Sequence, residues 1–355
     1  MLPAVLLAAG NATPAPPPLH VTVRNELPLA RQSETVEIPA ASLAPLGDLS
    51  SIHVFDGDRE VVAQVLDIDG RQTLIFQTDV EAGGSRSYEL RAGVPRRYRK
   101  EDFRVYGRFV RERYDDFAWE NDRVAHRMYG QALETWQKEP LTSSAVDVWL
   151  KKTKALIIND WYMTDDYHRD HGEGGDFYSA GTSRGCGGDG LWQDGQLIVS
   201  KNFRNSRVLA AGPIRLVFEL DYPGFETKRV TLDAGQNFNR FESRFSDANS
   251  AYAAGIKKFA STDLRVEKAA GWIRAWGPVV GGTGHFACTL VVDPASIAAV
   301  TESGDNHLVV ARQPASYWVG TAWDQGGDFK TAEDWDRYAG QWTQRVKSPL
   351  RVEVK

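Results

Sequence analysis

The chain has 355 residues, of which 42% are hydrophobic and 25% are charged, and these are ordinary values for a globular protein. This length can form one large domain or two moderate ones. A formal net charge of -5 gives no basic footprint, so the composition speaks against a nucleic-acid partner. No later stretch approaches the roughly 20 apolar residues of a membrane helix, so membrane insertion is not expected.

Residues 1–18 have the features of a trimmed leader. A short apolar run over residues 3–9 precedes a proline-rich segment, as at the end of a secretory signal, although the positively charged start of such a signal is missing. We therefore expect residues 1–18 to be a signal-peptide remnant and linker. The same feature predicts a periplasmic or secreted protein.

Hydrophobic and polar residues alternate with a period of two from residue 19, and turn pairs such as Asp56-Gly57 and Asp69-Gly70 separate the runs. The runs span residues 20–25, 34–38, 51–55, 61–66, 73–77 and 85–90. Short strands with frequent turns predict a small β-sandwich-like domain over residues 19–92. Residues 91–101 are rich in proline, glycine and cations, which is typical of a connector.

Residues 100–355 continue in the same style and predict broad antiparallel sheets. Runs typical of strands lie at 206–210, 214–220, 227–232, 239–245, 287–292 and 307–311. Residues 191–199 predict a hairpin that turns at Asp194-Gly195. Residues 145–161 are interpreted as a strand that enters a more apolar segment. Only residues 331–346 show helical spacing, after the capping sequence that begins at Thr331, so we expect an all-β protein with few helices.

Glycines alternate with ionisable and aromatic side chains over residues 167–188, which we call the glycine loop. Such a composition speaks against a regular helix or strand and is typical of a loop that presents side chains to a ligand. The loop carries Tyr167, His168, Asp170, His171, Glu173, Asp176, Tyr178 and Arg184. We expect it to open into a cavity and to meet the segment 108–129 there.

The segment 108–129 mixes charged side chains with large aromatic rings. On a strand, Trp119 and Arg123 would share one face, while Glu120 and Asp122 would share the other. Either face could line a cleft.

Aromatic residues are abundant, with 11 Trp, 12 Tyr and 15 Phe. Exposed aromatic faces often bind sugars, and Trp119, Trp161, Trp192 and Trp323 are candidates to stack on sugar rings. Packing inside a large β-protein is the alternative for each. The two cysteines, Cys186 and Cys288, could form one disulfide, but the sequence cannot show whether they meet.

Three blocks of the chain resemble a bacterial family known as the domain of unknown function 4861. The blocks are Arg-Phe-Val-Arg-Glu-Arg-Tyr-Asp-Asp-Phe-Ala-Trp-Glu-Asn-Asp-Arg (108–123), Tyr-His-Arg-Asp-His-Gly-Glu-Gly (167–174) and Tyr-Trp-Val-Gly-Thr-Ala-Trp (317–323). The resemblance implies a galactose-mutarotase-like β-supersandwich over residues 100–355. It also implies a companion of enzymes that dismantle uronic-acid polysaccharides such as pectin and ulvan, and a relative of an oligosaccharide dehydratase acting on ulvan fragments.

For a uronic-acid oligosaccharide, β-elimination by a lyase or dehydratase needs a base for the C5 proton, an acid for the leaving oxygen and a cation for the carboxylate. We expect His168 or His171 to be the base and Tyr167 or Tyr178 to be the acid. Arg184 is the first candidate to hold the carboxylate, and Arg123 is the second.

The remaining polar side chains leave alternatives open. The residues expected to contact an oligosaccharide substrate are Trp119, Glu120, Asp122, Arg123, Asp170, Glu173, Asp176, Tyr178 and Trp192. The three carboxylates of the loop could instead accept backbone N–H groups and fix its shape. His168, Asp170 and His171 are also candidate ligands of a divalent cation, although their spacing matches no known zinc signature.

Two other functions compete with elimination. A glycoside hydrolase would pair Glu120 or Asp122 with Asp170 or Glu173, because hydrolysis needs carboxyl groups that flank the scissile bond. A non-catalytic sugar-binding protein would need only the aromatic and polar contacts.

Overall fold

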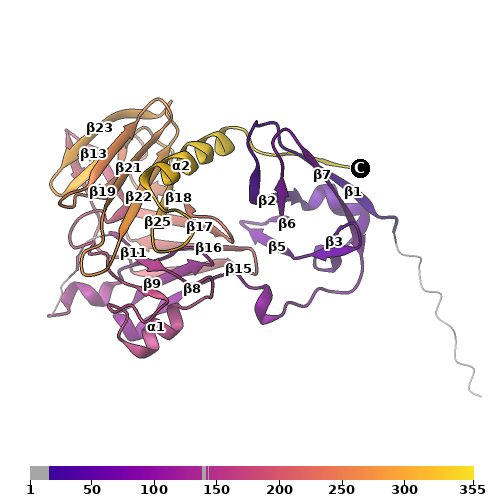
Figure 1. The fold of residues 1–355 in the computed structure, drawn as a ribbon, viewed down its shortest axis with the longest axis horizontal. Coiled ribbons are helices and arrows are strands. Elements are labelled where there is room, and N and C mark those ends of the chain that lie inside the picture. Colours follow the sequence, from indigo (N-terminus) through magenta and orange to yellow (C-terminus); the bar gives the residue numbers. More distant parts are fainter. Residues whose placement is uncertain (1–15, 138–140, 143) are drawn as a thin grey trace, which may run out of the picture.

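A computed structural model describes residues 16–137, 141–142 and 144–355 (Figure 1). The expected leader lies almost entirely outside these residues. The first seven strands are β1 (Leu19–Arg24), β2 (Arg31–Pro39), β3 (Ile52–Asp56), β4 (Arg59–Val61), β5 (Ala63–Ile68), β6 (Arg71–Val80) and β7 (Ser85–Ala92). Short 3-10 helices are η1 (Ala40–Leu46), η2 (Leu49–Ser51), η3 (Lys100–Asp102), η4 (Arg111–Arg113) and η5 (Gln131–Thr135).

The strands that follow, up to the middle of the chain, are β8 (Val105–Val110), β9 (Asp116–Asn121), β10 (Ala125–Met128), β11 (Val146–Lys151), β12 (Gly174–Gly175), β13 (Cys186–Gln193), β14 (Gln196–Ile198), β15 (Asn205–Ala211) and β16 (Arg215–Tyr222). The later strands are β17 (Glu226–Asp233), β18 (Phe238–Phe245), β19 (Ala251–Lys257), β20 (Asp263–Glu267), β21 (Trp272–Pro278), β22 (His285–Val292), β23 (Ile297–Ser303), β24 (Asn306–Ala311), β25 (Ala315–Trp323) and β26 (Arg351–Val354). The two α-helices are α1 (Ile158–Thr164) and α2 (Ala332–Lys347).

The chain forms two lobes, which lie side by side in Figure 1. The N-terminal lobe packs a five-stranded sheet, in the order β26-β1-β7-β3-β4, against the three-stranded sheet β2-β6-β5. Buried and more exposed residues alternate along its strands, as the sequence predicts. On β1, for example, Val21 and Val23 point into the core and Thr22 between them does not. The last strand, β26, pairs with β1, so the end of the chain returns to the N-terminal lobe, which the sequence did not indicate.

The large lobe contains β8 to β25. An eight-stranded antiparallel sheet, β15-β16-β17-β18-β25-β22-β21-β20, packs one face against two five-stranded sheets. These smaller sheets have the orders β12-β11-β10-β9-β8 and β14-β13-β19-β24-β23. A single apolar core fills the space between the layers, so the prediction of an all-β fold is confirmed.

Two helices cover outer faces of these sheets. Helix α2 begins after the N-cap Thr331, as predicted, and packs Trp335 and Ala339 onto the eight-stranded sheet. Helix α1 covers the outer face of the sheet that contains β9, β10 and β11. Residues 146–151 form the expected strand, β11, and the more apolar segment that follows it leads into α1 at residues 158–164. The apolar residues of segment 158–164 pack as a short helix. An apolar run alone does not distinguish a buried strand from a helix. No helix in the described residues is both long and apolar enough to cross a membrane.

Cys186 and Cys288 form a disulfide between β13 and β22, which settles the pairing that the sequence left open. The bond joins one of the five-stranded sheets to the eight-stranded sheet across the core. Both cysteines are fully buried.

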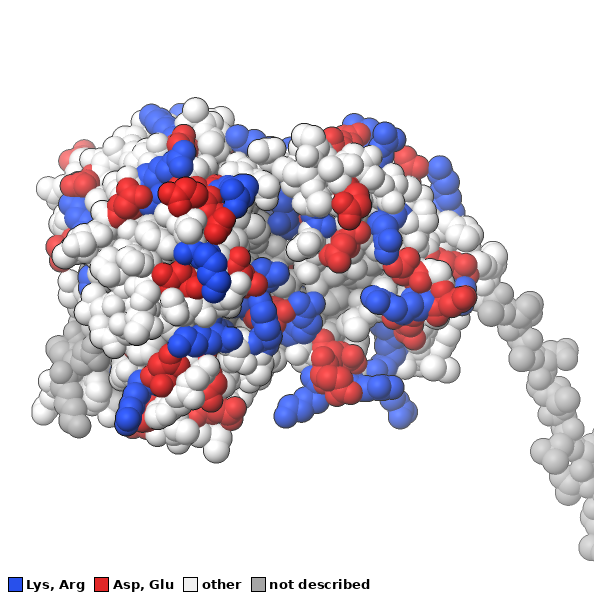
Figure 2. Space-filling model, viewed as in Figure 1, with Lys and Arg blue, Asp and Glu red and all other residues white. Residues whose placement is uncertain are grey.

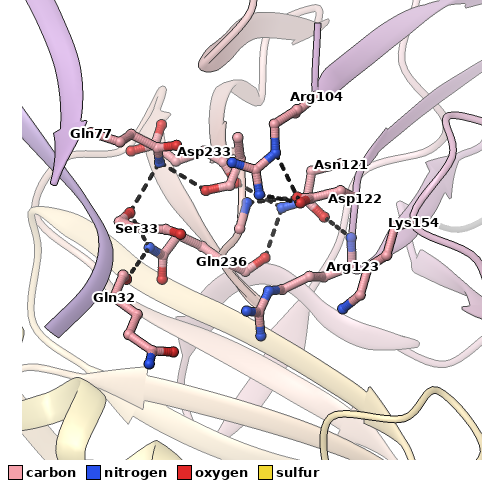
Figure 3. Close-up of polar contacts among 12 residues, drawn as sticks. Gln32, Ser33, Gln77, Arg104, Asn121, Asp122, Arg123, Lys154, Asp233 and Gln236 are labelled. Carbon is pink, nitrogen blue, oxygen red and sulfur yellow. Dashed lines mark hydrogen bonds and ion pairs between the residues drawn. The ribbon is translucent and has the colours of Figure 1, made fainter. Parts of the chain in front are cut away.

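Polar side chains join the two lobes (Figure 3). The Gln236 side chain of the large lobe donates to the backbone oxygens of Gln32 and Ser33. In the opposite direction, Gln77 of the N-terminal lobe donates to the backbone oxygen of Ala234 at 2.8 Å. Beside these contacts, a cavity of about 550 Å³ lies between the lobes, and Figure 2 shows a hollow there with charged residues of both signs around it.

Candidate functional site

The glycine loop covers the outer face of the sheet formed by β8 to β12. Tyr167 stacks on Trp149 of β11 with ring centres 4.8 Å apart. Gly174 pairs with Lys151 of the same strand. Gly174 has a φ of 104°, and a Cβ there would lie 1.9 Å from the Leu150 carbonyl oxygen. Only glycine fits this close approach, so at this position the glycine content lets the loop lie flat on the sheet.

A charged cluster is buried beneath the loop, with Arg127 of β10 at its centre. Asp147 lies directly opposite Arg127 on β11, and Asp116 on β9 points to the same face, two residues before the partner of Arg127. The Arg127 guanidinium lies 2.8 Å from both Asp147 and Asp176 and 3.5 Å from Asp116. Tyr129 also donates to Asp147 at 2.9 Å. Thus one cation faces three carboxyl groups, which we call the Arg127 cluster.

Burial shifts the protonation of this cluster. It raises the pKa of Asp116 to about 7, although Arg127 acts against the shift. Burial and the neighbouring Asp147 also raise the pKa of Asp176. Burial alone would lower the pKa of Arg127, but its three carboxyl neighbours hold that pKa well above the ordinary value. The cluster can therefore retain a proton near neutral pH while its arginine stays charged.

Several polar atoms of the cluster are not satisfied. Neither carboxyl oxygen of Asp116 accepts a hydrogen bond from a described residue, and the same holds for Asp176 Oδ1. Buried polar groups are normally paired, so such a concentration is typical of a site that exchanges protons or holds a ligand.

His168 lies above the cluster. Its Nδ1 atom is 3.0 Å from the backbone oxygen of Asp176 and 3.7 Å from the Asp176 carboxylate. A carbonyl oxygen can only accept, so Nδ1 carries the proton and Nε2 is the basic nitrogen of the neutral ring. The His168 side chain is 67% exposed, so this nitrogen is accessible to a molecule from solvent.

The backbone next to the cluster is strained. Tyr114 and Asp115, which directly precede Asp116, have φ values of 51° and 67°. Two successive non-glycine residues in this region are uncommon, and such strain is concentrated at functional sites. Arg113 donates to the Tyr167 hydroxyl at 2.8 Å and so ties this segment to the glycine loop. The glycine loop therefore contacts the segment 108–129, as expected, but the residues that make this contact are buried.

His171 and Asp170 face away from the cluster. The His171 side chain is 51% exposed and pairs with Asp166 at 2.9 Å. Asp170 pairs with Lys152 and accepts the backbone N–H groups of Gly172 and Gly174. Asp170 thus fixes the shape of the glycine loop through backbone N–H groups, which was the alternative to contacting substrate.

These contacts do not form the expected cation site. His168, Asp170 and His171 each turn to a different partner, and no group of three or more His, Cys, Asp or Glu side chains in the described part of the chain could hold a metal ion. Glu173 is half-buried, and its backbone oxygen accepts from the Lys152 N–H at 2.7 Å.

Arg184 and Tyr178 do not reach the loop surface. Arg184 is buried in the core, where it donates to Ser144 Oγ at 3.0 Å, and burial lowers its pKa to about 10. Tyr178 is buried against Phe259 and Phe286. Tyr167 and Arg184 are both buried, so neither shares the exposed position of His168.

The four candidates of the strand segment are also mostly interior. Trp119 is fully buried and donates to Asn239 at 2.8 Å. Glu120 is buried with Lys151 at 2.5 Å and accepts two backbone N–H groups at the start of α1, from Ile157 and Ile158. These contacts hold the sheet and α1 together rather than face a cleft.

Asp122 accepts from Arg104 and from the Gly235 N–H, and it lies beside the polar contacts that join the lobes in Figure 3. Arg123 is half-buried, lies 3.5 Å from Asp328 and lines a small cavity beside Trp323. Among the predicted rings, Trp192 is half-buried on β13 against an outer cluster that includes Leu308.

The sequence analysis missed Arg127, Asp116 and Asp147. Asp116 lies in the block 108–123 that carries the family resemblance and Arg127 lies just after it, but their meeting depends on the register between strands. A second buried cluster was also missed, in which Lys228 pairs with Asp189 and Glu226 and Ser243 bridges the two acids. Burial raises the pKa of Glu226 to about 7.

Two solved structures have a similar fold. One is a protein of glycosyl hydrolase family 38 from Enterococcus faecalis, with a TM-score of 0.52 and 9% identity over 95% of this chain and 47% of that chain. The other is an alpha-mannosidase from Enterococcus faecalis, with a TM-score of 0.50 and 8% identity over 95% of this chain and 46% of that chain. The present chain spans about half the length of both, and at this identity the likeness concerns the fold alone.

A relative in Formosa agariphila, called uncharacterized protein P7, is 30% identical, and the match covers 94% of this chain and 93% of that protein. The family described as "Domain of unknown function (DUF4861)" matches residues 23–352. The resemblance seen in the sequence is thus confirmed, and the chain belongs to the DUF4861 family.

Proposed function

We propose that this protein is a carbohydrate-active enzyme that acts on acidic oligosaccharides, with His168 as its base. The observation that carries the proposal is the placement of His168, whose Nδ1 is fixed by Asp176 while its Nε2 faces solvent. A base held in this way by a neighbouring oxygen is a common arrangement for proton abstraction near neutral pH. The sugar substrate is supported by the fold, which is similar to that of two proteins named as carbohydrate-processing enzymes.

The Arg127 cluster is the proton-holding partner in this proposal. Asp176 joins the cluster to the His168 ring, so a proton taken up by His168 can be stabilised by the buried carboxyl groups below it. Asp116, with its pKa raised to about 7, supplies a group that changes charge in the working range of pH. Arg127 and Asp147 are positioning residues, since Arg127 holds Asp176, Asp147 holds Arg127, and both are buried.

Two reactions fit this acid–base centre. Hydrolysis is favoured by the comparisons, because the similar structures are named as a glycosyl hydrolase and an alpha-mannosidase. Elimination is favoured by the geometry at His168, because an accessible base for the C5 proton is one of its requirements, whereas hydrolysis needs carboxyl groups on both sides of the bond. The carboxyl groups of the Arg127 cluster converge on one guanidinium and do not flank an open space.

Product analysis tests the proposal. The full-length protein is incubated with oligosaccharides of glucuronate or galacturonate and with matched neutral oligosaccharides, and the products are weighed by mass spectrometry. Hydrolysis adds water across a split bond, whereas elimination creates a conjugated double bond that absorbs in the ultraviolet. Turnover of acidic but not neutral substrates is expected. Absence of turnover on every acidic substrate, or turnover that is unchanged in His168→Ala, contradicts the proposal.

A further inference from the structure

A cavity of about 570 Å³ lies on the outer face of the eight-stranded sheet, away from the glycine loop. Its floor is formed by the outer side of β22 and β25, its roof by the C-terminal end of α2, and its rim by residues 293–296 and 312–314. The volume falls within the usual range of small-molecule sites, roughly 300 to 1,000 Å³. It is large enough for a disaccharide.

One wall of the cavity is apolar and aromatic. Trp318 of β25 is half-buried, and its strand neighbours on the two sides are Val291 of β22 and Arg240 of β18. Val346 of α2 and Pro314 complete this wall. A partly open indole beside aliphatic groups offers the flat surface on which the C–H face of a pyranose ring packs.

Positive charge dominates the charged part of the lining. Arg312 and Lys347 line the cavity, whereas Asp293 is its one acidic lining residue. Asp293 is already engaged by the Ala295 N–H at 3.0 Å. The Lys347 side chain is exposed and makes no hydrogen bond or ion pair with the described residues. Its ammonium group is therefore available to an anion. Arg240 lies 5.8 Å from the centre of the Trp318 ring but does not line the cavity, and it is paired with Glu242 at 3.0 Å.

The cavity between the lobes is less suited to an anion, although it is almost as large. Its lining contains the acids Asp56, Glu60, Asp79 and Asp102 as well as three arginines. Arg86 is paired with Asp56 there, and Arg104 with Asp122, so two of the three cations are already neutralised. The contrast singles out the cavity at Trp318.

We propose that this cavity is a second sugar-binding site, which takes a pyranose that carries a carboxylate. Trp318 stacks on the ring, and Lys347 and Arg312 bind the carboxylate. The choice of an acidic sugar rests on the proposed function, but binding here does not require the chemistry at His168. Such a site would hold a polysaccharide chain to the protein while another part of the chain reaches the glycine loop, and so raise the effective concentration of substrate.

The test is calorimetric titration of the full-length protein with a galacturonate trisaccharide, a sulfated trisaccharide and a neutral trisaccharide. We expect saturable binding of the galacturonate, weaker binding at high salt because the contact is ionic, and no measurable binding of the neutral sugar. Trp318→Ala should weaken the affinity by about tenfold, and Lys347→Glu by about the same factor, since each removes roughly 1 to 1.5 kcal/mol. Lys347 is exposed, so its substitution leaves the fold intact.

Trp276→Ala is the matched control, because Trp276 is half-buried on the neighbouring strand β21 and does not line the cavity. Its affinity should equal that of the wild type. Equal affinity in Lys347→Glu and wild type, equal binding of the neutral sugar, or preference for the sulfated sugar would overturn the proposal. His168→Ala separates the two proposals: it should abolish turnover and keep this binding, whereas a wild type that binds without turnover would refute only the proposed function.

Discussion

Arg127 lies 3.5 Å from Asp116, close enough for an ion pair but too far for a hydrogen bond. Asp116 is therefore the least well satisfied carboxyl group around Arg127, while Asp147 and Asp176 each approach to 2.8 Å. Burial raises the pKa of Asp116 to about 7, and burial also raises the pKa of Asp176 despite its closer contact with Arg127. The raised pKa of Asp116 makes the free energy of unfolding depend on pH near neutrality, where the stability of most proteins changes little.

The sign of that pH dependence can be stated. The pKa of Asp116 is about 7 in the folded protein and ordinarily 3.8, so between these values the folded state holds a proton that the unfolded state has lost. The free energy of unfolding therefore falls as pH rises from about 5 to 7, by up to about 1.4 kcal/mol per pH unit from this group. Asp116→Asn should remove this contribution, so the variant gains stability relative to the wild type as pH rises. Urea unfolding at several pH values measures the difference.

Asp58→Asn is the matched control for this experiment, because it makes the same change on an exposed side chain in the turn between β3 and β4 of the N-terminal lobe, outside the Arg127 cluster. Its pH profile should follow that of the wild type. A difference between Asp116→Asn and wild type that stays constant from pH 5 to 8 would contradict the raised pKa of Asp116.

Loss of Arg127 should destabilise the protein strongly. Arg127→Met leaves Asp116, Asp147 and Asp176 buried around an uncharged side chain, and such a broken ion-pair cluster costs about 3 to 5 kcal/mol. The matched control is Lys258→Ala, which breaks the surface pair between Lys258 and Glu302 and should cost less than about 1 kcal/mol. Chemical denaturation compares the two variants with the wild type, and similar costs for both would show that the cluster is not strongly coupled.

The two histidines of the glycine loop should differ in their effect on turnover. His168→Ala should lower kcat by at least about a hundredfold, because it removes the proposed base above Asp176. His171→Ala should leave kcat within a few-fold of the wild type, because His171 pairs with the exposed Asp166 and faces away from the cluster. Steady-state kinetics on the acidic oligosaccharide identified by product analysis provide the measurement. Equal losses in both variants would place the base elsewhere.

The disulfide should be a major source of stability. Cys186 and Cys288 are 102 residues apart, and a cross-link that closes a loop of this length stabilises a protein by about 4 to 5 kcal/mol in the chain-entropy description. The double variant Cys186→Ala/Cys288→Ala should unfold at correspondingly lower denaturant concentration. A reductant should lower the midpoint of the wild type and leave that of the double variant unchanged, and a wild type that is indifferent after complete reduction would contradict this role.

The sequence by itself determined the local backbone of this protein. Alternation with a period of two predicted most strands of the N-terminal lobe and several of the large lobe, Asp194-Gly195 predicted the turn between β13 and β14, and Thr331 predicted the start of α2. These features depend on the φ and ψ preferences and the exposure of residues close together in the chain, so a local pattern contains them. The unusual glycine loop was recognisable for the same reason.

Only the tertiary structure decided which side chains meet and which are accessible. Asp116, Arg127 and Asp147 come together through the register of three strands, and Asp176 joins them from a loop, which no local pattern specifies. The packing of the chain likewise buries Arg184 in the core and leaves His168 at the surface. Burial and register are set by packing between segments distant in sequence, and the same packing shifts the pKa values from which a catalytic role can be argued.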